Sequence, residues 1–141
     1  MLSRDERIHV MKEGSGKMDK FLVIFIGGGA GSLARFLLGT AIMNRYTGRF
    51  PLGTFAINVS GSFLIGVLMV LLTDRLSPHP NWRLGLVVGF LGGYTTFSSF
   101  EWETYFATRE GNSLIGLLYV VTSVTAGYIA TWIGASIIGR Q

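Results

Sequence analysis

Four long apolar runs restrict this chain to a membrane-spanning, helical fold. The runs cover residues 21–42, 52–73, 84–106 and 114–138. Within them the only Asp, Glu, Lys or Arg residues are Arg35, Glu101 and Glu103. An α-helix needs about 20 consecutive apolar residues to cross a bilayer core of about 30 Å. The sequence therefore predicts an all-α membrane protein with four transmembrane helices.

The remaining sequence is too short for a separate soluble domain. The chain has 141 residues, of which 49% are hydrophobic, and a mean hydropathy of +0.46. We predict a polar N-terminal leader over residues 1–20, expected to be flexible, and a transmembrane domain over residues 21–141. The leader lacks the early apolar core of a signal peptide. There is no cysteine, and both histidines, His9 and His79, lie outside the apolar runs, which argues against disulfides and metal catalysis.

The basic residues bear on topology, because short cytoplasmic loops are enriched in Lys and Arg. The N-terminal side of the membrane would hold eight of them: Arg4, Arg7, Lys12, Lys17, Lys20, Arg75, Arg83 and Arg140. The opposite side would hold three: Arg45, Arg49 and Arg109. If the chain began at Met18, the first four would be lost and the count would be four against three. The shorter chain would carry almost no orientation signal, so two oppositely inserted copies could pair. The charges form no stripe that indicates nucleic acid.

The first span combines small residues with one charge. Gly27 and Gly31 have the spacing that lets helices approach closely. Arg35 lies about two-thirds along the span, where an unpaired guanidinium is costly. As a structural charge, its side chain either reaches the membrane interface or pairs with an acid or with helix carbonyls. The functional alternative is an electropositive vestibule that attracts anions.

The second span has a polar face. Thr54, Asn58 and Ser62 recur every fourth residue and share one side of a helix. An unsatisfied amide in lipid costs several kcal/mol, so this face must contact protein or water. Asn58 is either a bond between helices or a ligand for a permeating species.

The third span contains a predicted break and an aromatic pair. Residues 92–96 concentrate weak helix formers in the middle of the run. A break at membrane depth exposes main-chain oxygens and is tolerated only inside protein or along a cavity. Phe97 and Phe100 follow on one face, beside Ser99. They are either core packing or rings whose positive edges face an anion. Glu103 is either a solvated acid or a partner of Arg35.

The fourth span adds hydroxyls. Tyr119, Ser123 and Gly127 recur every fourth residue, with Thr122 and Thr125 beside them. Such hydroxyls often bond to their own helix, so alone they are weak signals of a pathway. Together with the second and third spans they offer many neutral donors, a pattern that suits a small anion that must be solvated without being trapped.

The chain resembles the small CrcB-type fluoride channels, also called Fluc, from about Phe21 nearly to its C-terminus. The likeness rests on the glycine-rich first span ending in Arg35, the block Gly53-Thr54-Phe55-Ala56-Ile57-Asn58-Val59-Ser60-Gly61-Ser62, and above all residues 89–104 with Gly-Gly-x-Thr-Thr-Phe-Ser-Ser-Phe. The resemblance implies an antiparallel, dual-topology homodimer in the cell membrane. It also implies two fluoride pathways and a structural sodium ion at the dimer centre.

The resemblance assigns roles to residues that match the family pattern. Gly92 and Thr95 would bind sodium through main-chain oxygens where the third helix is broken. The fluoride pathway would be lined by Asn58, Phe97, Phe100, Ser99, Tyr119 and Ser123, and Arg35 and Glu103 would be vestibule or structural charges. Some family members have a hydroxyl where this chain has Gly127; here that donor would be absent or supplied by Thr122 or Thr125.

These observations predict passive export of fluoride down its electrochemical gradient, which would lower its toxicity. Two other classes remain. A proton-coupled small multidrug transporter would need a membrane-embedded carboxylate, for which Glu103 is the only substitute. A non-transporting assembly subunit would need only the glycine stripes. An enzyme is disfavoured, since no nucleophile, base and orienting group occur at a recognisable spacing.

Overall fold

The computed structural model describes residues 4–76 and 79–139, with the backbone alone for residues 4–17. All regular structure in this part of the chain is helical. Helix α1 spans Arg4–Met43, α2 spans Leu52–Val70 and continues as a π-helical turn η1 (Leu71–Arg75), and α6 spans Ser113–Gly139. Between them lie α3 (Pro80–Arg83), the π-helix η2 (Leu84–Leu91), α4 (Gly92–Tyr94) and α5 (Phe97–Arg109). The backbone of residues 4–20 is thus helical, and the flexibility of the leader stays a prediction.

Three helices have the length and composition to cross a membrane. They are Met18–Met43, Leu52–Arg75 and Ser113–Gly139. The third predicted run, 84–106, is divided because Thr95 and Thr96 are extended, with φ/ψ of −80°/159° and −149°/116°. The helix break predicted at residues 92–96 is present, and it leaves two segments that are each too short to count as a span. That this segment crosses the membrane therefore stays a prediction.

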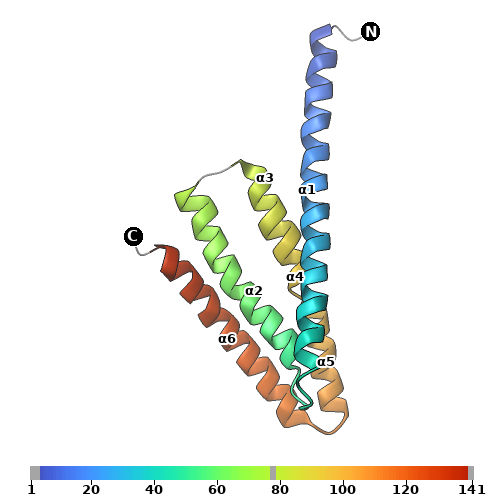
Figure 1. The fold of residues 1–141 in the computed structure, drawn as a ribbon, viewed down its shortest axis with the longest axis vertical. Helices are drawn as coiled ribbons and strands as arrows, with labels where there is room; N and C mark the ends of the chain where they lie inside the picture. Colours follow the sequence, from blue (N-terminus) through green and yellow to red (C-terminus); the bar gives the residue numbers. More distant parts are fainter. Residues whose placement is uncertain (1–3, 77–78, 140–141) are drawn as a thin grey trace.

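Figure 1 shows the helices side by side, with α2 between α6 and the segment from α3 to α4, and with that segment beside α1. The segment from α3 to α4 packs along α1, and α2 packs along α6. Helix α5 continues beyond the break and packs against α6. At the break Thr96 is buried, whereas Gly92 and Phe97 on either side of it are exposed.

Glycines set both helix crossings. A Cβ atom at Gly31 would meet the carbonyl oxygen of Phe90, and one at Gly27 would meet that of Gly85. On the other side, a Cβ atom at Gly66 would meet the carbonyl oxygen of Thr131. The predicted packing role of the first-span glycines is confirmed, because these backbones touch directly.

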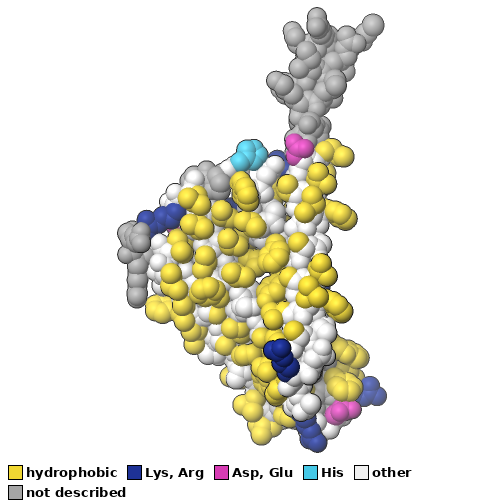
Figure 2. Space-filling view, viewed as in Figure 1, with side chains coloured by type: hydrophobic (Ala, Val, Ile, Leu, Met, Phe, Trp, Pro, Cys, Tyr) yellow, Lys and Arg dark blue, Asp and Glu magenta, His cyan; other side chains and the backbone are white. Residues whose placement is uncertain are grey.

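The outer surface is apolar over most of its length. Figure 2 shows hydrophobic side chains across the visible face, with the charged side chains mostly towards the two ends. Phe25 and Phe36 of α1 are 79% and 66% exposed. Buried hydrophobic side chains are few by comparison: Ile57, Leu91, Tyr94, Phe100 and Tyr119. Such a surface suits lipid or a second copy of the chain.

The Gly66 contact gives a stability prediction. Gly66→Ala places a methyl group against the Thr131 carbonyl and is expected to lower the free energy of unfolding by about 1–3 kcal/mol through overpacking. Gly29→Ala is the matched control, because no atom lies within 4 Å of a Cβ there. Thermal unfolding in detergent measures both. Equal unfolding temperatures for the two variants would contradict this account of the α2–α6 crossing.

Candidate functional site

Two hydrogen bonds made by the Asn58 side-chain amide stabilise the extended backbone at the helix break. Asn58 Nδ2 donates to the Thr96 carbonyl oxygen at 2.9 Å, and the Thr96 amide donates to Asn58 Oδ1 at 2.9 Å. The Thr96 hydroxyl then accepts from the Ser99 amide at 3.2 Å and caps α5. Of the two roles left open for Asn58, the structure shows the bond between helices, and one amide hydrogen remains for another partner.

Arg35 also binds the break. Its Nη1 donates to the Thr95 carbonyl oxygen at 3.1 Å. Glu103 has different partners: Thr54 Oγ1 donates to Oε1 at 2.7 Å and the Tyr119 hydroxyl donates to Oε2 at 2.8 Å. Arg35 and Glu103 thus do not pair with each other in this structure, and Glu103 is a hydrogen-bonded acid instead of a solvated one.

The aromatic pair extends into a short stack. The rings of Phe97 and Phe100 have centroids 5.7 Å apart, and those of Phe100 and Tyr119 are 5.0 Å apart. Phe100 is 7% exposed and Tyr119 is fully buried, whereas Phe97 is 72% exposed. Phe100 is therefore part of the protomer core, while Phe97 presents its ring outwards.

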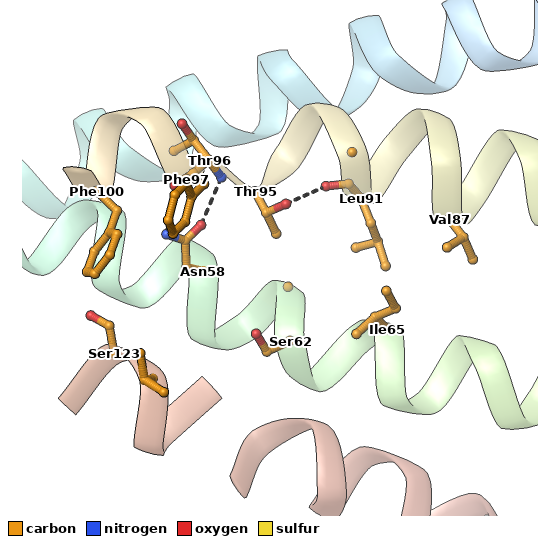
Figure 3. Close-up of a pocket in the computed structure, with 13 residues that line it drawn as sticks. Asn58, Ser62, Ile65, Val87, Leu91, Thr95, Thr96, Phe97, Phe100 and Ser123 are labelled. Atoms are coloured by element: carbon orange, nitrogen blue, oxygen red, sulfur yellow. Dashed lines mark hydrogen bonds between the residues drawn. The ribbon is translucent and has the colours of Figure 1, made fainter. Parts of the chain in front are cut away.

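One cavity lies beside this stack. This inner cavity has a volume of about 420 Å³, and Figure 3 shows the side chains that line it. Its lining includes Asn58, Ser62, Thr96, Phe97, Phe100 and Ser123. The hydroxyl of Ser123 is buried and has no hydrogen-bond partner among the described residues. Gly92 and Thr95 line the same cavity, so most of the predicted pathway residues meet here.

A second cavity, the vestibule, lies where α1 ends and α2 begins. Its volume is about 800 Å³. Its lining includes Arg35, Arg49, Thr54, Thr96, Ser99 and Glu103. Thr96 lines both cavities, so the helix break separates the vestibule from the inner cavity. Tyr119 lines neither and forms the wall between Glu103 and Phe100.

Three residues of the site were not predicted from the sequence. Thr96 caps α5, and a threonine just before a helix is a signal that could have found it. Arg49 lies in the loop after α1 and donates to Asn112 Oδ1 at 3.1 Å, a contact without a local sequence signal. Phe50 packs edge-on against Tyr119, with centroids 5.3 Å apart.

The fourth span supplies fewer free hydroxyls than predicted. The Thr122 hydroxyl donates to the Leu118 carbonyl of its own helix at 2.6 Å. Thr122 and Thr125 are absent from the lining of both cavities. Neither takes the position beside Gly127, where the nearest side-chain atom is Ser62 Oγ at 3.3 Å from a Cβ built on the glycine.

Comparisons with known proteins agree on one family. A family model described as "CrcB-like protein, Camphor Resistance (CrcB)" matches residues 22–135. A protein named fluoride-specific ion channel FluC from Solibacter usitatus is 66% identical over 121 residues, covering 86% of this chain and 99% of that protein. Proteins with the same name from Acidobacterium capsulatum and Coxiella burnetii are 45% and 41% identical, covering 82% and 85% of this chain and 92% and 97% of their own lengths.

Proposed function

We propose that this chain, which belongs to the CrcB-like family, is a multi-pass membrane protein that conducts fluoride passively out of the cytoplasm. The relatives named as fluoride-specific channels match nearly their whole length. The observation that carries the proposal is the inner cavity, in which Phe97, Phe100 and the unpaired Ser123 hydroxyl lie at a helix break. Export of fluoride lowers its toxicity without any chemical step or energy source.

The pathway begins in the vestibule. Arg35 and Arg49 line it together with the single acid Glu103, and Glu103 accepts two hydrogen bonds from protein. The arginines raise the local concentration of anions. Ser99, which lines the vestibule next to the Thr96 cap, offers the first hydroxyl to a partly dehydrated ion.

The aromatic pair then replaces part of the hydration shell. The edges of Phe97 and Phe100 carry partial positive charge, and the free amide hydrogen of Asn58 and the Ser123 hydroxyl add neutral donors. Tyr119 holds Phe100 in place through ring contact. Selectivity over chloride follows from a narrow path whose donors fit the smaller ion.

We further propose that the channel is an antiparallel homodimer. Gly92, Phe97, Ser98 and Ser99 are exposed at the break, although irregular backbone at membrane depth must be covered by protein or water. A second, oppositely inserted copy would cover this surface and complete two pathways. The full sequence places eight basic residues on the N-terminal side and three on the other, and without the four charges before Met18 the count would be four against three, a near-even balance that would permit insertion in both directions.

The break also fits the sodium ion that the family implies. In an unbroken helix the Gly92 carbonyl would accept from the Thr96 amide, which here binds Asn58 instead. Its oxygen is therefore available to a hard cation, as in unwound transporter helices. The Thr95 carbonyl accepts from Arg35 and keeps a second lone pair. These oxygens from two copies would hold sodium, whose role would be to tie the two breaks together.

Cysteine cross-linking tests the antiparallel dimer, because the chain has no cysteine of its own. Ser98→Cys lies at the break, where the two-fold axis would bring it next to its own copy, and is expected to form an oxidised dimer in membranes. Ile137→Cys, 58% exposed near the end of α6, is the control and should stay monomeric, since antiparallel copies place it on opposite membrane surfaces. Cross-linking of the second variant alone would indicate parallel copies.

Fluoride conduction is tested in liposomes. Purified protein is reconstituted with potassium fluoride or potassium chloride inside, valinomycin is added, and an ion-selective electrode follows anion efflux. We expect rapid fluoride release and no chloride release. Release of neither ion from dimeric protein would overturn the channel and direct attention to drug-coupled proton transport or to partner proteins.

A further inference from the structure

Ser62 presents a hydroxyl to the inner cavity that no part of the described chain binds. It lies one helical turn after Asn58 on α2 and lines the cavity with Asn58 and Ser123 (Figure 3). Its carbonyl oxygen accepts from Thr131 at 2.9 Å, but its Oγ takes part in no hydrogen bond within the described residues. The side chain is half-buried, so its hydroxyl is available to whatever enters the cavity.

Most other helical hydroxyls nearby are bound to their own backbone. Ser60, Thr95, Thr104 and Thr122 each donate to a carbonyl three or four residues earlier. This is the usual arrangement for serine and threonine in membrane helices. Ser62 and Ser123 depart from it, and both line the same cavity.

Gly127 provides the space that the Ser62 hydroxyl occupies. A Cβ atom at Gly127 would lie 3.3 Å from Ser62 Oγ and 3.9 Å from Ser62 Cβ. Thr131 fixes the register of the two helices there, since its hydroxyl donates to the carbonyls of both Ser62 and Gly127, at 2.9 and 3.1 Å. The Ser62 side chain is thus held against the hollow in α6, one turn beyond Ser123.

We infer that Ser62, seated opposite Gly127, is a further fluoride-binding residue of the pathway and follows Ser123 along it. This inference rests on the proposed function. Two unpaired hydroxyls from two helices offer neutral donors in succession, so an ion can move from one to the next. The Ser62 hydroxyl on α2 thereby supplies the hydrogen-bond donor that a hydroxyl side chain at position 127 of α6 would supply.

The test removes the hydroxyl at position 62 of α2 and then restores a hydroxyl at position 127 of α6. Ser62→Ala is expected to slow fluoride efflux about tenfold, because the charged ion loses one hydrogen-bond donor along the pathway. The double variant Ser62→Ala with Gly127→Ser is expected to recover most of that loss. With alanine at position 62 the new side chain faces a Cβ at 3.9 Å instead of an oxygen at 3.3 Å, so it fits.

Two controls separate the hydroxyl from its packing. Ser62→Ala with Gly127→Ala fills the same hollow without a donor and should stay slow. Thr122→Val removes a hydroxyl bound to its own helix and should leave efflux unchanged. Elution of each variant as the wild-type oligomer in detergent checks folding.

The outcomes are distinct. Wild-type efflux in Ser62→Ala, or equal recovery by alanine and serine at position 127, would overturn the role of Ser62 while leaving the channel in place. A wild-type protein that releases no fluoride would overturn the proposed function and this inference together.

Discussion

Replacing Phe97 by isoleucine is expected to slow fluoride efflux at least about tenfold, because the ring edge that faces the ion is lost. Phe97 is the better residue of the aromatic pair for this test, because its substitution affects the pathway without disturbing the protomer core. Its side chain is 72% exposed, whereas Phe100 is 7% exposed and packs on Tyr119. Phe97→Ile should therefore leave the stability of the protomer nearly unchanged, and Phe100→Ile should slow efflux and also weaken the core.

A matched control uses an equally exposed ring outside both cavities. Phe25 of α1 is 79% exposed, and Phe25→Ile should leave efflux at the wild-type rate. Electrode measurements in liposomes compare the three variants, with cross-linking through Ser98→Cys to confirm that each still dimerises. Wild-type efflux in Phe97→Ile dimers would remove that ring from the mechanism.

The parts of the fold that sequence reasoning predicted are those with a local signal. The apolar runs predict the long helices. Gly27 and Gly31 predict the close approach of α1 to a neighbouring helix, and the weak helix formers at residues 92–96 predict the break before α5. Each follows from residues within one or two turns of each other. The common face of Thr54, Asn58 and Ser62 is likewise a property of one helix.

The contacts that sequence reasoning left open join residues far apart in the chain. Glu103 meets Thr54 and Tyr119, 49 and 16 residues away, and Arg35 meets a carbonyl 60 residues away. These pairs depend on how far one helix is shifted along another, and glycine contacts set that shift. A carboxylate near the end of an apolar run gives no sign of which helix will supply its donors.

The site shows the same division. The residue types of an anion pathway were readable from the sequence, but their distribution over two cavities was not. Tyr119 is fully buried and lines neither cavity of the protomer, so its place in the pathway stays a prediction. The sequence indicates Thr122 or Thr125, on the same helix, as the substitute for a hydroxyl at Gly127, whereas the hydroxyl that approaches Gly127 belongs to Ser62 of α2.

The second large effect concerns Asn58 and separates its two roles. Asn58→Ala removes both hydrogen bonds to the Thr96 backbone, which leaves an amide and a carbonyl unpaired inside the bundle at a cost of about 1–3 kcal/mol each. We expect the free energy of unfolding to fall by about 2–6 kcal/mol and efflux to fall with it, because α5 loses its position. Asn112→Ala, which removes an amide whose bond to Arg49 is exposed to solvent, should change stability by less than about 0.5 kcal/mol.

Thermal unfolding in detergent and liposome efflux are measured on the same preparations of both variants. If Asn58→Ala unfolds at the wild-type temperature and yet conducts poorly, the amide acts on the ion and the paired bonds to Thr96 are dispensable. If Asn58→Ala unfolds at a lower temperature than the wild type but its folded dimers conduct normally, the amide stabilises the helix break and does not act on the ion. A fall in both is the expected result, since the amide that keeps Thr96 extended also fixes the start of α5, from which Phe97 and Phe100 reach the cavity.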